Sequence, residues 1–136
     1  MTKDRFLLLA DDDTRPFWEG CREHRLLFQK CQGCGHVRWP PSIACPVCYS
    51  GNTELISSAG RGKVYTFAVF HKAVAPTFEG RVPYVAAVVE LTEGPRILTN
   101  VVGCDPSEIS CDMAVEIVWE DATDTVCLPK FRPESR

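Results

Sequence analysis

The sequence lacks long hydrophobic runs, and this excludes the simplest membrane and secretory classes. Its first apolar run, Phe6 to Ala10, is ended by three consecutive aspartates, whereas a membrane-spanning helix needs about 20 apolar residues. A secretory signal peptide also needs a longer apolar core and a small-residue cleavage site, and we find neither. We therefore expect a cytoplasmic protein with no membrane partner.

An excess of basic charge is also missing. The chain has 15 Lys and Arg against 18 Asp and Glu, a net charge of −3, so it exerts no long-range attraction on phosphate backbones. Residues 61–136 alone have eight basic and eleven acidic side chains. A single-stranded nucleic-acid site needs a basic groove with stacking aromatics, so we expect no nucleic-acid partner. Nucleic-acid binding stays an alternative because four aromatic side chains could stack on bases: Tyr65, Phe67, Phe70 and Trp119. Packing in the core explains these residues more simply.

The motifs of common enzyme classes are absent as well. There is no nucleophile elbow, phosphate-binding Walker loop, dinucleotide fingerprint or HExxH motif. His24, His36 and His71 are isolated in the sequence, and we interpret each as a surface or packing residue. We assign no catalytic residue and expect a chain that is not catalytic by itself, which favours an accessory or binding role.

Cysteine, in contrast, is abundant, and half of it is paired in a metal-binding pattern. Cys31-Gln-Gly-Cys34 and Cys45-Pro-Val-Cys48 are two CxxC pairs separated by ten residues. In a reduced protein each pair forms a knuckle whose turn aims two thiolates at one ion. Four thiolates suit zinc, with iron second. Because four protein ligands fill the coordination sphere, the predicted zinc is structural. The other four cysteines are interpreted as small buried hydrophobes: Cys21, Cys104, Cys111 and Cys127.

The chain length allows one or two small domains, and the pattern along it is mainly β. Residues 1–25 form an N-terminal helical segment, in which Asp13 or Thr14 caps a helix with Pro16 in its first turn. Phe17, Cys21 and His24 lie on one face of this helix at helical spacing.

Residues 26–60 form a rubredoxin-like zinc ribbon, with a strand at 26–29 and a polar connection at 52–60. This segment is shorter than the roughly 40 residues below which a chain usually needs a disulfide or a metal ion to fold. Structural zinc contributes about 10–16 kcal/mol of apparent binding free energy, which is enough to fold it.

Residues 61–136 are expected to form a five-stranded OB-fold barrel. Alternating or β-branched runs predict its strands, which lie at 64–70, 84–89, 97–102, 113–119 and 125–128. Asp105-Pro106-Ser107-Glu108 reads as a capping box that starts a short helix. A proline-containing tail, residues 129–133, follows the last strand.

The order of these motifs is similar to that of a known family. The stretches that carry the likeness are Pro16 to Glu19, Leu26 to Gly35, Trp39 to Pro41, Cys45 to Cys48, Gly60 to Phe67, Pro83 to Ala86, Glu93 to Arg96 and Leu128 to Pro133. From about residue 14 to residue 133, the chain resembles the zinc-ribbon plus OB-fold proteins of acyl-CoA metabolism (domain of unknown function family thirty-five). Asp112 stands where that family usually has glycine. Asp tolerates left-handed backbone, so we expect the turn to be retained.

The resemblance implies an accessory subunit of a thiolase-fold enzyme, either a thiolase or a retro-aldolase. The partner subunit then carries the catalytic groups, and the barrel lies near the entrance for the CoA thioester. The resemblance assigns the zinc ligands to Cys31, Cys34, Cys45 and Cys48. It suggests basic residues at strand ends as CoA contacts: Arg61, Lys63, His71 and Lys72. A free-standing nucleic-acid module and a rubredoxin-like electron carrier stay open as alternatives.

Overall fold

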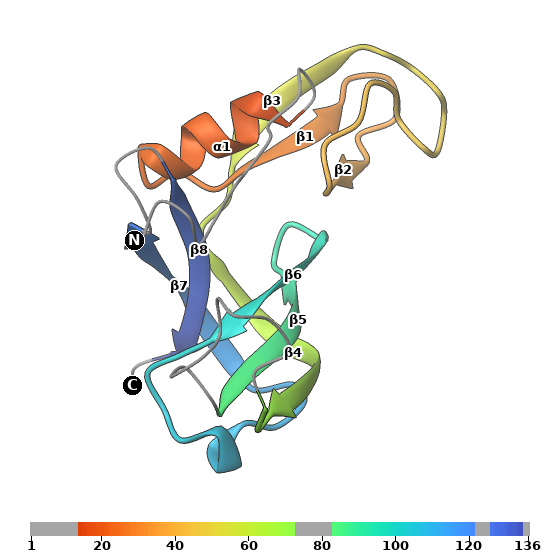
Figure 1. The fold of residues 1–136 in the computed structure, drawn as a ribbon. Coiled ribbons are helices and arrows are strands. Elements are labelled where there is room, and N and C mark those ends of the chain that lie inside the picture. Colours follow the sequence, from red (N-terminus) through yellow and green to blue (C-terminus); the bar gives the residue numbers. More distant parts are fainter. Residues whose placement is uncertain (1–13, 73–82, 122–125, 135–136) are drawn as a thin grey trace.

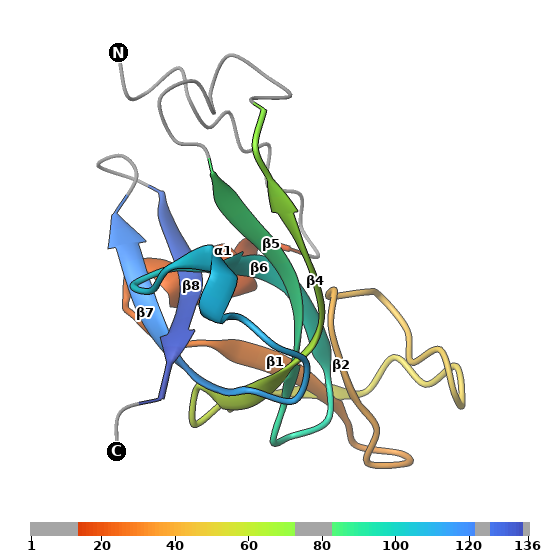
Figure 2. The same ribbon diagram turned by 90° about the horizontal axis from the view of Figure 1, so that it is seen from below.

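The computed structural model describes residues 14–72, 83–121 and 126–134. A helix and a small sheet lie at one end of the molecule, and a closed barrel forms the other end (Figure 1). The view from below shows the barrel strands wrapping around one another (Figure 2). None of the helices in these described ranges has the length and apolar character needed to cross a membrane.

Helix α1, Arg15–Arg22, has Pro16 in its first turn as predicted, and Thr14 stands at the N-cap position without making a side-chain capping hydrogen bond. Phe17 and Cys21 are buried on its inner face, where the helix packs against strands β1 (Leu27–Cys31) and β8 (Cys127–Pro133). The prediction that His24 extends this buried stripe is wrong. The helix has already ended, and His24 is exposed with a left-handed φ of 59°.

The ribbon sheet has β1 at its centre, between β2 (Val37–Arg38) and β3 (Thr53–Ser57). Strand β3 lies within 52–60, where the sequence predicted only a polar connection, and that prediction is wrong. Its five residues pair antiparallel with all five of β1, from Thr53 opposite Cys31 to Ser57 opposite Leu27. The strand forms because β1 offers a free edge for backbone hydrogen bonds, which a polar sequence satisfies as well as an apolar one.

Five strands close the barrel in the order β4-β5-β6-β8-β7. All neighbouring strands are antiparallel except β6 and β8, which are parallel. This arrangement, with a short helical turn between the third and fourth barrel strands, is the predicted OB-fold. The remaining elements are β4 (Arg61–Phe70), β5 (Tyr84–Leu91), β6 (Arg96–Val101), β7 (Ala114–Asp121) and the 3₁₀ turn η3 (Pro106–Glu108).

The last barrel strand differs from the sequence prediction. A tail was expected from residue 129, but β8 continues through Pro129 to Pro133. The carbonyl of Pro129 accepts a 2.8 Å hydrogen bond from the Thr99 hydroxyl, and Phe131 is fully buried in the core. Proline disfavours a strand because it cannot donate to the ladder, but here pairing with β7 and burial of Phe131 outweigh that preference. Residue 125, where the strand was expected to start, lies outside the described residues.

One continuous apolar core joins the helix to the barrel. It includes Phe17 and Cys21 from α1, Phe28 from β1, and inward-facing barrel residues such as Val89 and Phe131. Strand β5 alternates buried and half-buried residues along its whole length, as expected for a strand with one face on the core. The inward-facing side chains of the described strands therefore fill the centre of the barrel.

Two local predictions for the loops are confirmed. Asp105 accepts a hydrogen bond from the N–H of Ser107 and closes a capping box with Glu108, although the helix is a single 3₁₀ turn. Asp112 has a φ of 68°, the left-handed conformation that the family reaches with glycine. Its N–H donates a 2.7 Å hydrogen bond to the carbonyl of Val64, which holds the turn on β4.

Candidate metal centre

The two CxxC segments fold into matching knuckles. In the first, the N–H of Gly33 donates to Cys31 Sγ at 3.3 Å, and the N–H of Gly35 donates to the Cys31 carbonyl at 2.8 Å. In the second, Val47 donates to Cys45 Sγ at 3.4 Å, and Tyr49 donates to the Cys45 carbonyl at 2.8 Å.

The two knuckles also share a backbone conformation. Gly35 and Tyr49 occupy equivalent places, with φ values of 81° and 66°. Glycine reaches this left-handed conformation at no steric cost, whereas Tyr49 adopts it against the usual preference of a side-chain-bearing residue. The turn is therefore imposed by the knuckle's hydrogen bonds rather than by local propensity.

The four sulfur atoms converge on one point. Cys31 Sγ lies 3.5 Å from Cys48 Sγ, and Cys34 Sγ lies 3.6 Å from Cys45 Sγ. All four sulfurs lie within 4.8 Å of one another. A tetrahedron with metal–sulfur distances of about 2.3 Å has edges of about 3.8 Å, so the cluster matches a tetrathiolate site. The donor set suits zinc, and its four ligands leave no open position.

Backbone donors in each knuckle favour the thiolate form of its first cysteine. The N–H of Cys34 and other turn donors lower the pKa of Cys31 to about 6. The N–H of Cys48, followed by that of Val47, lowers the pKa of Cys45. Metal ions bind the thiolate rather than the thiol. The first cysteine of each knuckle thus favours the charged form that a zinc ion requires, whereas burial and the neighbouring cysteine sulfurs raise the pKa of Cys34 to about 12.

Arg38 supports the knuckles from within the ribbon, and sequence reasoning did not single it out. Its side chain is 4% exposed. Nε donates to the hydroxyl of Ser42 at 2.9 Å, and Nη2 donates to the hydroxyl of Thr53 at 3.0 Å. The Ser42 N–H in turn donates to Oε1 of Gln29 at 2.8 Å. These bonds tie the loop between the CxxC pairs to β1 and β3. The only sequence signal was a cation between the two CxxC pairs.

The basic residues suggested as CoA contacts do not gather in one place. Arg61 and Lys63 lie at the start of β4, whereas His71 and Lys72 follow its end. His71 lies ten positions after Arg61, which corresponds to about 30 Å of extended strand. These four assignments therefore form two separate pairs, and as CoA contacts they stay predictions.

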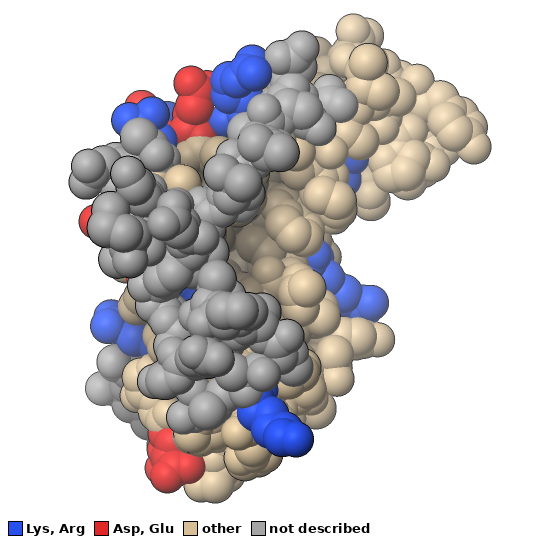
Figure 3. Space-filling model, viewed as in Figure 1, with Lys and Arg blue, Asp and Glu red and all other residues tan. Residues whose placement is uncertain are grey.

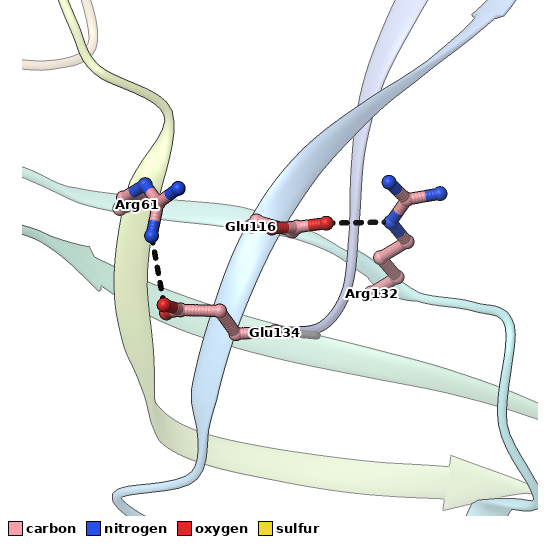
Figure 4. Close-up of polar contacts among 4 residues, drawn as sticks. All are labelled: Arg61, Glu116, Arg132 and Glu134. Carbon is pink, nitrogen blue, oxygen red and sulfur yellow. Dashed lines mark hydrogen bonds and ion pairs between the residues drawn. The ribbon is translucent and has the colours of Figure 1, made fainter. Parts of the chain in front are cut away.

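The first pair is neutralised by acidic neighbours. Arg61 forms a 2.7 Å ion pair with Glu134 (Figure 4), and Lys63 lies 3.7 Å from Glu90 and 3.9 Å from Asp112. On the adjacent strands Arg132 pairs with Glu116 at 2.9 Å (Figure 4). A cavity of about 590 Å³ beside Arg61 and Lys63 is also lined by Glu90 and Glu134, so its charged lining is balanced.

The wider surface shows no concentration of basic charge on the face drawn in Figure 3, where Lys and Arg side chains are scattered over the ribbon and the barrel.

The interpretation of the aromatic residues as core is wrong for Tyr65, which is 48% exposed with the Arg96 guanidinium 3.8 Å above its ring. Phe67 and Trp119 pack partly buried against the core. Phe70 stacks on Tyr84 at 5.0 Å.

The four remaining cysteines divide by burial. Cys21 and Cys127 are buried and Cys104 is partly buried, but Cys111 is exposed. The interpretation as a buried hydrophobe is therefore wrong for Cys111, which follows η3 in a surface turn. Burial raises the pKa of both the Cys21 and the Cys127 thiols to about 12.

The fold and the four-cysteine site together define a zinc-ribbon protein with an OB-fold barrel. Comparison with known families agrees with this class. Residues 18–54 match the rubredoxin-like zinc ribbon domain of ChsH2, and residues 56–120 match the C-terminal OB-fold domain of ChsH2.

The chain matches curated relatives of about its own length and others that are much longer. It is 39% identical over 135 residues to a DUF35 domain-containing scaffold protein of Methanocaldococcus jannaschii, covering 93% of this chain and 94% of that protein. It is 43% identical over 118 residues to a probable enoyl-CoA hydratase alpha subunit of Thermomonospora curvata, covering 86% of this chain. The chain spans only 36% of the length of that subunit. It is also 30% identical over 112 residues to the benzoylsuccinyl-CoA thiolase subunit BbsA of Thauera aromatica, covering 82% and 69% of the two chains.

A solved structure shares the whole architecture. A chain of the Ltp2-ChsH2(DUF35) aldolase superposes with a TM-score of 0.86 at 39% identity, covering 93% of this chain and 98% of that one. The protein belongs to the DUF35 family of zinc-ribbon and OB-fold proteins. This family assignment and the converging sulfurs together support a structural zinc ion in the ribbon.

Proposed function

We propose that this chain is the non-catalytic accessory subunit of a thiolase-fold enzyme that makes or breaks carbon–carbon bonds in acyl-CoA thioesters. The observation that carries the proposal is the likeness, over 93% of the chain, to the DUF35 component named in the Ltp2-ChsH2 aldolase. A relative named as a thiolase subunit adds to it. The partner subunit supplies the catalytic groups, and this chain stabilises the complex and helps to bind the CoA thioester.

The tip of the ribbon has the character of a docking surface. Ile43, Val47 and Tyr49 lie between and beside the knuckle cysteines, with 80%, 61% and 81% of their side chains exposed. Exposed apolar side chains gathered in one place mark protein-interaction sites, whereas scattered single ones need no explanation. A zinc-clamped loop presents them on a rigid backbone, so little ordering entropy is lost on binding.

For the CoA thioester, the proposal favours the end of β4 that includes His71 and Lys72. Both residues are exposed, and neither forms an ion pair with the part of the chain that the structure describes, so an ammonium and an imidazole there are available to CoA phosphates. Arg61 and Lys63 would have to exchange their pairing with Glu134 and Glu90. They therefore rank second as phosphate contacts.

The bound metal is proposed to be zinc, held by Cys31, Cys34, Cys45 and Cys48. All eight cysteines are free of disulfides, which fits a reducing compartment such as the cytoplasm. The second reading of the same site is a rubredoxin-like electron carrier with iron at the four sulfurs. It is favoured by the exposure of Cys34 and Cys48, since electron exchange needs a cluster near the surface. Metal analysis of the purified chain decides between them, because zinc has no redox chemistry.

The test is co-expression of this chain with a thiolase-fold subunit from the same genome, followed by assays of each component. We expect the complex to cleave or form the carbon–carbon bond and the isolated chain to be inactive. Turnover of an acyl-CoA thioester by the isolated chain would overturn the proposal, as would failure to recover any thiolase-fold protein on co-expression.

A pair of surface variants locates the interface. Val47→Asp places a charge on the ribbon tip and should weaken partner binding by at least about tenfold, since a buried unpaired charge costs several kcal/mol. Leu98→Asp is the matched control, because Leu98 is a similarly exposed residue (65%) on the barrel. Equal loss of binding in both variants, or loss in Leu98→Asp alone, would reject the ribbon tip as the docking surface.

Nucleic-acid binding is not part of the proposal. Arg61 at the start of β4 and Arg132 on β8 are paired with Glu134 and Glu116, so these two cations contribute little to the counterion release that drives binding to a phosphate backbone. A salt-dependent shift of a single-stranded oligonucleotide at low ionic strength would contradict this expectation.

A further inference from the structure

Three side chains of zinc-binding types meet at a second place, away from the knuckles. His24 follows the end of α1, Asp121 ends β7, and Cys127 begins β8. Their ligand atoms all lie within 4.8 Å of one another. In Figure 1 the C-terminal end of α1 lies beside the end of β7 and the start of β8.

The separation between His24 Nε2 and Asp121 Oδ1 fits an edge of a zinc site as well as it fits a long hydrogen bond. His24 Nε2 lies 3.4 Å from Asp121 Oδ1, beyond the usual range of about 2.7–3.2 Å for an N–H···O hydrogen bond. Zinc binds nitrogen, oxygen and sulfur at about 2.0–2.3 Å, so the edges of its tetrahedron are about 3.3–3.6 Å. A nitrogen–oxygen separation of 3.4 Å is one such edge. Imidazole, carboxylate and thiolate together form a donor set that zinc accepts.

The His24 ring and the Cys127 sulfur are held in place by the structure around them, and Asp121 is held by its hydrogen bonds to these two residues. The His24 ring stacks on the Trp119 ring with centroids 5.3 Å apart and an interplanar angle of 4°, which restricts rotation of the imidazole. Hydrogen bonds with Cys127 and then with His24 lower the pKa of the Asp121 carboxyl, so the carboxylate is charged at neutral pH. Cys127 is only 3% exposed, and its sulfur is fixed by the start of β8.

Solvent reaches the site from one side. The side chains of His24 and Asp121 are 50% and 71% exposed, whereas Cys127 lies beneath them. An ion entering from solvent therefore meets the nitrogen and the oxygen first and the sulfur at the bottom. Three protein ligands leave one coordination position for water, in contrast to the closed site of the ribbon.

We propose that His24, Asp121 and Cys127 form a second zinc site, which ties the end of α1 to barrel strands β7 and β8. His24 and Asp121 are 97 residues apart in the chain, so the ion cross-links distant parts of the sequence at a place where α1 packs against β8. Binding displaces the Cys127 proton to solvent. The inference stands apart from the proposed function, because it concerns the chain without its partner.

The experiment uses the full chain with its ribbon loaded with zinc, titrated with cobalt(II). We expect one cobalt ion per chain, with the charge-transfer absorption of a single thiolate ligand, while mass spectrometry still finds one zinc per chain. Removing one protein ligand should weaken cobalt binding by at least about tenfold, since even loss of a supporting outer-shell partner costs 10–100-fold. The exposed variants His24→Ala and Asp121→Asn test this without disturbing the core.

Control variants separate this site from nonspecific binding. His71→Ala removes an exposed histidine, and Cys111→Ser removes an exposed cysteine, and neither should change the affinity for cobalt. We expect the buried Cys127→Ser variant to lose the thiolate absorption. Its unfolding transition is measured alongside to check that the variant is folded. The proposal is overturned if the wild-type chain takes up no cobalt beyond the ribbon, or if His24→Ala and Asp121→Asn bind it as the wild type does.

Discussion

The hydroxyl of Ser58 donates a 2.7 Å hydrogen bond to Oε1 of Glu93, on the turn between β5 and β6. The N–H of Ala59 donates a second bond, at 2.9 Å, to the other carboxylate oxygen. One side chain of the barrel thus holds the short segment that connects the ribbon to the barrel. This relationship gives a physical role to Glu93, which was named from the sequence only within a stretch that carries the family likeness.

Glu93→Ala should loosen this connection. A hydrogen bond to a charged group contributes about 1.5–3 kcal/mol to the free energy of unfolding at a protected site. Because Glu93 is partly exposed, we expect its loss to cost about 1–2 kcal/mol. We expect a lower urea midpoint with an unchanged slope, and faster amide exchange at Ala59. Glu54→Ala, at an exposed position on β3, is the control and should change stability by less than about 0.5 kcal/mol. An unaltered midpoint for Glu93→Ala would contradict the assigned role.

Removal of the ribbon metal should unfold the ribbon. Cys31→Ser takes away a buried sulfur ligand, and structural zinc supplies about 10–16 kcal/mol of apparent binding free energy. We expect loss of one zinc per chain, loss of dispersed amide signals for residues 26–57, and loss of partner binding. Cys111→Ser, at an exposed cysteine outside the cluster, should keep all three. A soluble, metal-free Cys31→Ser protein that still supports the partner's activity would argue against a structural metal.

Gly60→Ala should destabilise the junction between the ribbon and the barrel. Gly60 has a φ of 74°, and a Cβ atom added there would collide with Ile117 Cγ2. Its carbonyl also accepts a 2.8 Å hydrogen bond from the N–H of Ile117, so the backbone cannot move away without cost. Left-handed backbone alone costs a residue with a Cβ about 1–2 kcal/mol, and the collision adds to it.

The matched control is Gly51→Ala, where an added Cβ meets only the Ile43 carbonyl at 3.8 Å. Thermal unfolding of the two variants checks the comparison. We expect Gly60→Ala to melt at a clearly lower temperature and Gly51→Ala to melt close to the wild type. Equal melting temperatures would show that the junction adapts without strain.

The Asp105 carboxyl should titrate below the ordinary range. The N–H of Ser107, followed by its hydroxyl, lowers the pKa of this carboxyl. Because the pKa is lower in the folded chain than in the unfolded one, the stabilisation is complete above about pH 4 and is lost as pH falls through the folded value.

Carboxyl NMR titration of a Ser107→Ala variant tests this assignment. We expect the pKa of Asp105 to rise but to stay below the ordinary value, since the backbone N–H still donates. Ser110→Ala, three residues further along the chain, should leave the pKa of Asp105 where it is in the wild type. A Ser107→Ala variant with the wild-type titration would show that the hydroxyl takes no part.

The alternating run on β7 was readable from sequence because a two-residue period reports directly which face is buried, and β5 was readable as an apolar run. Strand β3 and the second half of β8 were not readable. The polar residues of β3 pair with β1 only because the folded ribbon places that edge beside them. Pro129 lies within β8 because Phe131 fills the core and β7 supplies the pairing. In both strands a tertiary contact outweighs local propensity.

What the sequence determined by itself is the set of cysteines that converge in the ribbon. Each CxxC knuckle closes through hydrogen bonds between residues two and four apart, such as those from Gly33 and Gly35 to Cys31. Short-range geometry of that kind is contained in the spacing. Only the tertiary structure decided that Arg61 is paired with Glu134 and that His24 lies beside Asp121. Barrel closure brings strand ends together from distant parts of the chain, and no local pattern records which side chains then meet.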